Sequence, residues 1–311
     1  MSQLEKRVTS SDRLFQRQKQ KQGRLNFGKG MLFLLPSLFL FSVFLFYPMA
    51  RTLYLSFFLT DNRGMATVFV GFDNFSRIFS SDIFVKSLTS TFLFVLYTVP
   101  GTIIIALFLA ILANEKLKGV GVFRMIFSST MGISVAAASV FWLFLFHPSL
   151  GFLNQILRWL GVDAIGWLTD PNWALFSVSI STIWMNIGFT FLIMLGGLQS
   201  IDRYLYESAD IDGAGYFYKL RRITIPMLSP TLFFVVTVTM INAFQTFGQI
   251  DMLTRGGPQN ETNLLVYSIY REAFVNYQYG TASAQAVILF AIILIMTLIQ
   301  FKLGEKKVHY Q

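Results

Sequence analysis

Long apolar segments alternate with short polar connections along almost the whole chain. Six segments carry no charged side chain over a length that could cross a bilayer: roughly residues 31–50, 87–113, 125–146, 173–200, 227–250 and 273–301. A hydrocarbon slab about 30 Å thick requires about 20 residues of helix. Only helices satisfy the backbone hydrogen bonds of such isolated segments in lipid, and the two-residue alternation of barrel strands is absent. The pattern therefore predicts an all-α membrane protein with six transmembrane helices, in a domain over residues 31–303.

The distribution of basic residues predicts how these helices are oriented. Of the 25 Lys and Arg residues, eighteen fall on the side of the N-terminus and seven on the other side. Because basic loops stay in the cytoplasm, both termini are expected inside. The ends are then a basic cytoplasmic tail over residues 1–30 and a short one over residues 304–311. A cleavable signal peptide is the alternative for the N-terminal region, but the apolar run before Arg51 ends without a small-x-small cleavage site.

Composition narrows the class of protein further. Apolar residues make up 54% of the chain and charged residues only 13%, about half the charged share of an ordinary soluble domain. The net charge of +9 follows from the topology, and no aromatic-basic motif accompanies it, so we expect no nucleic-acid partner. The chain has no cysteine, which excludes disulfides and thiolate metal sites.

The chemistry that would drive transport is missing from the predicted helices. They hold no carboxylate, histidine or basic residue of the kind that ion-coupled transporters place inside the membrane. His147 falls at a helix end and His309 in the tail. The only Gly-Lys cluster near the start, Gly28-Lys29-Gly30, lacks the rest of a phosphate-binding loop. We therefore predict no catalytic residue, no metal site and no cofactor on this chain, and favour a pore subunit driven by a separate nucleotidase.

A polar, charged stretch over residues 199–226 lies between the fourth and fifth apolar segments. Asp202 is suited to cap a short helix that begins at Arg203, and Gly213 and Gly215 are expected to end that helix. The topology places this stretch in the cytoplasm.

A second helix is expected to run from about Tyr216 to Pro226, with the proline forcing Ile225 out of the helical region. Two amphipathic helices in this position could bind a groove on a soluble partner. The alternative is a solvated loop that faces lipid headgroups.

The spacing of residues in this hairpin resembles the cytoplasmic signature of the permease subunits of ABC importers, E-A-A-x3-G-x9-I-x-L-P. The matching residues are Glu207, Ser208, Ala209, Gly213, Ile223, Thr224, Ile225 and Pro226. Ser208 stands in place of an Ala and Ile225 in place of a Leu. Stretches at 70–75, 197–201, 256–258 and 267–274 resemble the carbohydrate branch of that family. The likeness covers about residues 30–311 and is strongest to permeases for glycerol phosphate and for oligosaccharides.

The resemblance implies a type I ABC importer permease in the bacterial cytoplasmic membrane that moves a sugar or oligosaccharide, with glycerol 3-phosphate or another polyol derivative as the alternative. Its implied partners are a homologous second permease, a cytoplasmic ATPase dimer that holds ATP and Mg²⁺, and an extracytoplasmic solute-binding protein. It also implies a coupling role toward the ATPase for Glu207, Ser208, Ala209, Asp210, Gly213, Ile223 and Pro226. A six-helix channel or passive facilitator is the alternative from another class.

Neutral hydrogen-bonding groups beside aromatic rings suit carbohydrate binding. The fourth and fifth predicted helices supply such groups near their middles: Thr182, Trp184, Asn186, Phe189, Asn242, Gln245, Thr246 and Phe247. The resemblance to sugar permeases implies a solute pocket on these two helices. The alternative is that the amides form hydrogen bonds between helices, a common role for polar residues in lipid.

Overall fold

The computed structural model describes residues 30–115 and 118–304. The chain divides into two compact units, residues 1–54 and residues 55–311. The predicted tails lie outside the described residues except for Gly30 and Gly304. In the first unit, the predicted first span falls within one helical stretch, Gly30–Leu55, which is long and apolar enough to cross a membrane. It contains a π-helical turn, η1 (Ser42–Phe46), and continues as α2 (Tyr47–Leu55).

A small two-stranded antiparallel sheet, which the all-α prediction did not include, opens the second unit of a chain that is otherwise mostly helical. The strands are β1 (Phe58–Thr60) and β2 (Ala66–Phe69). The Asp61 carboxylate closes the turn between them by accepting hydrogen bonds from the backbone N–H groups of Arg63 and Met65. Gly64 takes the left-handed conformation that the turn requires, with φ +75°.

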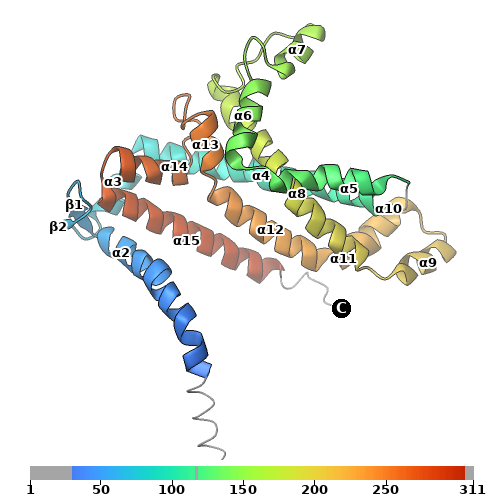
Figure 1. Cartoon of the computed structure of the whole chain (residues 1–311), viewed down its shortest axis with the longest axis horizontal. Helices are drawn as coiled ribbons and strands as arrows, with labels where there is room; N and C mark the ends of the chain where they lie inside the picture. The colour runs from blue at the N-terminus through green and yellow to red at the C-terminus, as the bar shows by residue number, and fades with distance from the viewer. Residues whose placement is uncertain (1–29, 116–117, 305–311) are drawn as a thin grey trace, which may run out of the picture. The chain divides into compact units, whose positions relative to one another are not determined.

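Three long helices form the frame of the second unit (Figure 1). They are α4 (Asp82–Asn114), α8 (Pro171–Gln199) and α15 (Tyr279–Gly304), and each is long and apolar enough to cross a membrane. Helices α4 and α8 pack side by side, and alanines on α4 at 106, 110 and 113 are fully buried in this contact. Small side chains let two helix backbones approach closely in lipid.

The third predicted span, 125–146, is not one straight helix. It is built from α5 (Val120–Ser128), a 3₁₀ turn η2 (Ser129–Gly132) and α6 (Val135–Leu145), with a bend of 107°. Ser134 starts α6 afresh, because its side chain accepts a hydrogen bond from the N–H of Ala137. The apolar composition predicts a membrane segment here, but the bend depends on the caps and on contacts with α8.

The fifth and sixth predicted spans also differ from the structure at their ends. The fifth, 227–250, is a helix α12 (Ser229–Phe244), a break, and a short helix α13 (Gly248–Leu253). The sixth, 273–301, begins only at Tyr279, because residues before it belong to α14 (Leu265–Tyr270) and the π turn η4 (Arg271–Val275). The remaining short helices are α3 (Asp73–Phe79), α7 (Phe152–Trp159), α9 (Arg203–Ile211), α10 (Tyr216–Lys219), η3 (Leu220–Thr224) and α11 (Ile225–Met227).

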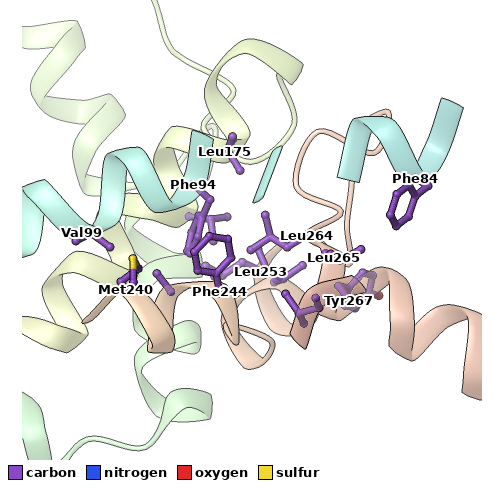
Figure 2. Packing of buried hydrophobic residues seen from close by; sticks show 14 of the residues in the cluster. Phe84, Phe94, Val99, Leu175, Met240, Phe244, Leu253, Leu264, Leu265 and Tyr267 are labelled. Atoms are coloured by element: carbon purple, nitrogen blue, oxygen red, sulfur yellow. The ribbon is translucent and has the colours of Figure 1, made fainter. Parts of the chain in front are cut away.

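The described residues thus contain four helices able to span a membrane, or up to six if each of two bent pairs forms one span. Two buried apolar clusters hold the second unit together. Figure 2 shows the larger one, in which side chains of α4, α8, α12, α13 and α14 meet. The smaller one joins α4, α8 and α12 toward the end of α8 that leads into residues 199–226.

Candidate functional site

The first helix of the 199–226 hairpin, α9, begins as the sequence predicts. The Asp202 side chain accepts a hydrogen bond from the N–H of Tyr204 at 2.9 Å, which satisfies one of the free donors at the helix start. Glu207 pairs loosely with Arg203 at 3.4 Å, and both side chains are more than half exposed. An exposed pair of this kind contributes little to stability, so the Glu207 carboxylate is available to the cation of a partner.

Gly213 makes the turn between the two helices of the hairpin. Its φ of +74° lies in the left-handed region, and its N–H donates to the carbonyl of Asp210. The N–H of Ala214 donates to the carbonyl of Ala209, so the chain closes α9 in the way that glycine commonly ends a helix. No heavy atom lies within 4 Å of where a Cβ on Gly213 would be, which leaves the tip of the hairpin open to solvent.

The second helix of the hairpin does not end at Pro226, and the prediction that Ile225 leaves the helical region is wrong. Ile225 has φ −65° and ψ −45°, and the helical path continues through α11. The reason is the π turn η3, in which the N–H of Ile225 donates to the carbonyl of Leu220. Because the wider turn shifts the hydrogen-bond pattern, the ring of Pro226 is accommodated. The break comes at Leu228, where the helix axis turns by 67° into α12.

Side-chain contacts join the two helices of the hairpin. The hydroxyls of Tyr206 and Thr224 lie 3.0 Å apart, and Lys219 donates to the carboxylate of Asp210. Asp210 is therefore engaged within the hairpin. Of the other predicted coupling residues, Ser208, Ala209, Ile223 and Pro226 are half-buried, while Glu207 and Gly213 are exposed.

A cavity of about 730 Å³ separates the hairpin from the ends of α4, α5 and α8. The face of α9 turned toward it carries Arg203, Tyr206, Glu207 and Asp210. This spacing of three and four residues places all four on one side of the helix. Open space therefore lies between the hairpin and the membrane helices to which it is joined.

Large apolar side chains lie exposed on the hairpin, which the sequence predicts to consist of two amphipathic helices. They are Tyr204, Leu205, Ile211, Tyr216, Phe217 and Tyr218, with Ile211 at 88% and Phe217 at 81% exposure. Exposed apolar groups gathered on a charged element mark a contact surface for another protein or for lipid. The signal was available in the sequence, since aromatic and aliphatic residues interrupt a stretch that is otherwise charged.

The predicted solute-path residues fall into two groups. The Thr182 hydroxyl donates to the carbonyl of Val178 in its own helix, and the Thr246 hydroxyl, in the break after α12, donates to the carbonyl of Asn242; both side chains are buried. Trp184 stacks on Phe141 of α6 at 5.8 Å, and Phe247 stacks on Tyr267 at 5.9 Å. These four side chains are engaged in contacts within the chain. Phe189 is half-buried.

The amides of Asn186, Asn242 and Gln245 form the second group. Within the described residues none of the three makes a side-chain hydrogen bond, and Asn242 and Gln245 are exposed although they lie at the end of a membrane helix. Free amides facing outward in an apolar segment need a polar counterpart. Sequence reasoning missed Gln249, one turn beyond Gln245, whose amide donates to the sulfur of Met185 at 2.9 Å.

Among residues 30–115 and 118–304, His, Asp and Glu side chains do not gather into a group of three that could hold a metal ion. Near the break, burial raises the pKa of the Tyr267 phenol above its usual value, with Asp251 adding to the effect. Tyr267 therefore stays a neutral hydrogen-bonding group at physiological pH.

Comparison with known proteins identifies the family. A sequence profile described as "Binding-protein-dependent transport system inner membrane component" matches residues 65–308. The chain belongs to this family. Its relatives include the sn-glycerol-3-phosphate transport system permease protein UgpA of Agrobacterium fabrum, 38% identical over 90% of this chain and 95% of the relative. UgpA of Yersinia enterocolitica is 35% identical over the same shares.

Solved structures of similar fold include a bacterial ABC transporter that imports the acidic polysaccharide alginate. Its matching chain has a TM-score of 0.78 and 25% identity, over 93% of this chain and 99% of that chain. A bacterial alginate ABC transporter in complex with a periplasmic protein that carries an alginate pentasaccharide matches with a TM-score of 0.76 and 25% identity, over 90% of this chain and 96% of that chain. The expected family is confirmed, and the chain is a multi-pass membrane permease with the fold of this transporter class.

In this permease, replacing Asn186 or Gln245 by alanine should lower the rate of transport. Each change removes one hydrogen-bonding group, worth about 1 kcal/mol, so we expect a loss of about fivefold each with normal amounts in the membrane. Initial rates of uptake in proteoliposomes measure the effect. Thr182→Val is the matched control, since its hydroxyl is bonded to its own helix, and its uptake should stay within about twofold of the unaltered protein. Full uptake by both amide variants would contradict a path at this place.

Proposed function

We propose that the chain is a permease subunit of an ATP-driven importer and that the 199–226 hairpin couples it to a separate ATPase. The hairpin carries this proposal: the family signature falls on a two-helix element with an exposed apolar surface, an available Glu207 and a cavity behind it. Docking into a groove of a soluble partner would bury the exposed aromatics. The ATPase dimer, and not this chain, would hold ATP and Mg²⁺.

We propose six spans with both termini in the cytoplasm. Six spans result if α5 with α6 counts as one bent span and α12, which follows the hairpin at a bend of 67°, is the membrane-crossing part of the second bent pair. The excess of basic residues on the side of the N-terminus supports this orientation. Bent spans are tolerated in membranes where neighbouring helices cover the free backbone groups.

The proposed solute is a sugar or a sugar derivative. Neutral amides and aromatic rings near the break in α12 suit hydroxylated solutes. Similarity to the UgpA proteins favours sn-glycerol 3-phosphate as the second candidate. The uncharged stretches predicted to cross the membrane hold no basic residue that could pair with a phosphate, so selection of an anionic solute would fall to a separate solute-binding protein.

Two further partners complete the proposed assembly. A homologous second permease would close the other side of the solute path, because Asn242 and Gln245 are exposed in this chain alone. An extracytoplasmic solute-binding protein would deliver the solute, as the complex of the alginate transporter with its periplasmic protein suggests.

Transport assays with and without nucleotide test this proposal. The chain is purified with the subunits that accompany it and reconstituted into liposomes, and uptake of radiolabelled sn-glycerol 3-phosphate and of a neutral disaccharide is measured. Uptake of one of them only with ATP on the ATPase side is the expected result. Equal solute movement without ATP, by the chain alone, would identify a passive channel and overturn the proposal.

A further inference from the structure

Helix α7 is held rigidly in the connection between α6 and α8 by a single buried side chain. Asn154 is fully buried, and its amide donates to the carbonyls of Pro148 and Ile165 at 3.0 and 2.9 Å. Its carbonyl oxygen accepts from the N–H of Ile165 at 3.1 Å and from the indole of Trp167 at 2.9 Å. All the hydrogen-bonding capacity of this amide is used to fix α7 onto the chain that follows it.

The opposite side of α7 is apolar and uncovered. Phe152, Ile156, Trp159 and Leu160 recur at helical spacing, so they share one face. Within that face Phe152 is 56%, Trp159 83% and Leu160 71% exposed. A rigid element that presents such a face is built to contact something apolar.

The chain places α7 at one end of the membrane helices. It lies between the end of α6 and the start of α8, whereas the hairpin follows the other end of α8 (Figure 1). Helix α8 has 29 residues, which corresponds to about 43 Å. This length exceeds a hydrocarbon slab of about 30 Å, so α7 sits at the level of the membrane surface opposite the hairpin.

Two features indicate that lipid, and not a protein, covers the apolar face of α7: this face is uncharged, and it continues the exposed apolar surface of α6. The apolar face carries no charged residue, and Gln155 and Arg158 lie on the neighbouring polar edge. Exposed apolar side chains lead from α6 into α7 through Phe144 at 73% and Leu150 at 75% exposure. Tryptophan beside an arginine on a short amphipathic helix is typical of segments that lie in the headgroup layer.

We infer that α7 is an interfacial anchor, with the Phe152–Trp159 face embedded in the lipid headgroup region at the end of the bundle opposite the hairpin. The Asn154 hydrogen bonds transmit its position to the stretch that leads into α8. The anchor thereby fixes the depth at which α8 begins.

Spin labelling tests this inference directly, because the chain has no cysteine of its own. Single variants Trp159→Cys and Phe152→Cys carry a nitroxide on the apolar face, and Gln155→Cys carries one on the polar edge as the matched control. The full chain, with the subunits that accompany it, is placed in liposomes of phosphatidylethanolamine and phosphatidylglycerol. Collision rates with oxygen, which concentrates in lipid, and with a water-soluble nickel chelate are then measured.

Labels at 152 and 159 should collide more often with oxygen than with nickel, and the label at 155 should show the reverse. Frequent nickel collisions at both 152 and 159 would place the face in water and overturn the inference. Protection of these two positions from both reagents would overturn it as well, because it would show that another protein covers α7. Using two positions on the face keeps the test decisive if one variant is not inserted.

Discussion

Replacing Gly213 by valine is expected to reduce ATP-driven uptake by about tenfold while the protein still inserts into the membrane. Gly213 has φ +74°, a conformation that costs a residue with a side chain about 1–2 kcal/mol and is hardest for a β-branched residue. A penalty of this size lowers the population of the correctly turned hairpin by about tenfold. Uptake in proteoliposomes at saturating ATP measures the loss.

Two control variants separate backbone conformation from crowding at the tip of the hairpin. Gly215→Val should transport normally, since Gly215 has an extended backbone with φ −69° and no neighbour within 4 Å of an added Cβ. Gly213→Asn should retain most of the uptake, because asparagine tolerates the left-handed region. Equal rates for Gly213→Val and Gly215→Val would contradict a coupling role for this turn.

The change Gly188→Ala is expected to destabilise the bundle by about 1–3 kcal/mol, the usual cost of overpacking. The N–H of Gly188 donates to the Thr130 hydroxyl at 3.0 Å, where the third span bends against α8. A Cβ on Gly188 would lie 2.4 Å from that oxygen and 3.1 Å from the backbone N of Met131. The contact between α8 and η2 at Gly188 and Thr130 must therefore widen to admit the methyl group.

Thermal unfolding in detergent and uptake in liposomes should both report the change at Gly188. The matched control lies on the same helix: Gly196 has no neighbour within 4 Å of an added Cβ, so Gly196→Ala should leave the unfolding temperature unchanged or raise it slightly. Unfolding temperatures that coincide for the two variants would contradict a tight contact between η2 and α8.

Features set by local chemistry were predictable from the sequence. Uncharged length predicted the candidate membrane segments, four of which are single long helices, while Asp202 marked the start of α9 and Gly213 its end. Each depends on one or two residues and a known geometric preference. The positions at which the first helix of the hairpin begins and the chain turns follow from the same local signals.

Features set by packing were not predictable in this way. The bend in the third span depends on Thr130 meeting Gly188, which lies 58 residues away. Pro226 stays helical because the π turn before it widens the helix. Among the path residues, sequence could not separate Thr182, bonded to its own backbone, from the free amide of Gln245.

The contact between Thr130 and Gly188 also divides α8 into two parts of unequal length, so that the helix can act as a lever about this point. Helix α8 has no proline beyond its first turn, so it can move as one rod. From Gly188 the arm toward the hairpin is about 16 Å long and the arm toward α7 about 26 Å. If α8 turns about this contact, its end near α7 moves about 1.6 times as far as its end near the hairpin. A tilt of about 5° then moves the two ends roughly 4 Å relative to each other. A small movement of a partner bound to the hairpin would then become a larger displacement at the opposite membrane surface.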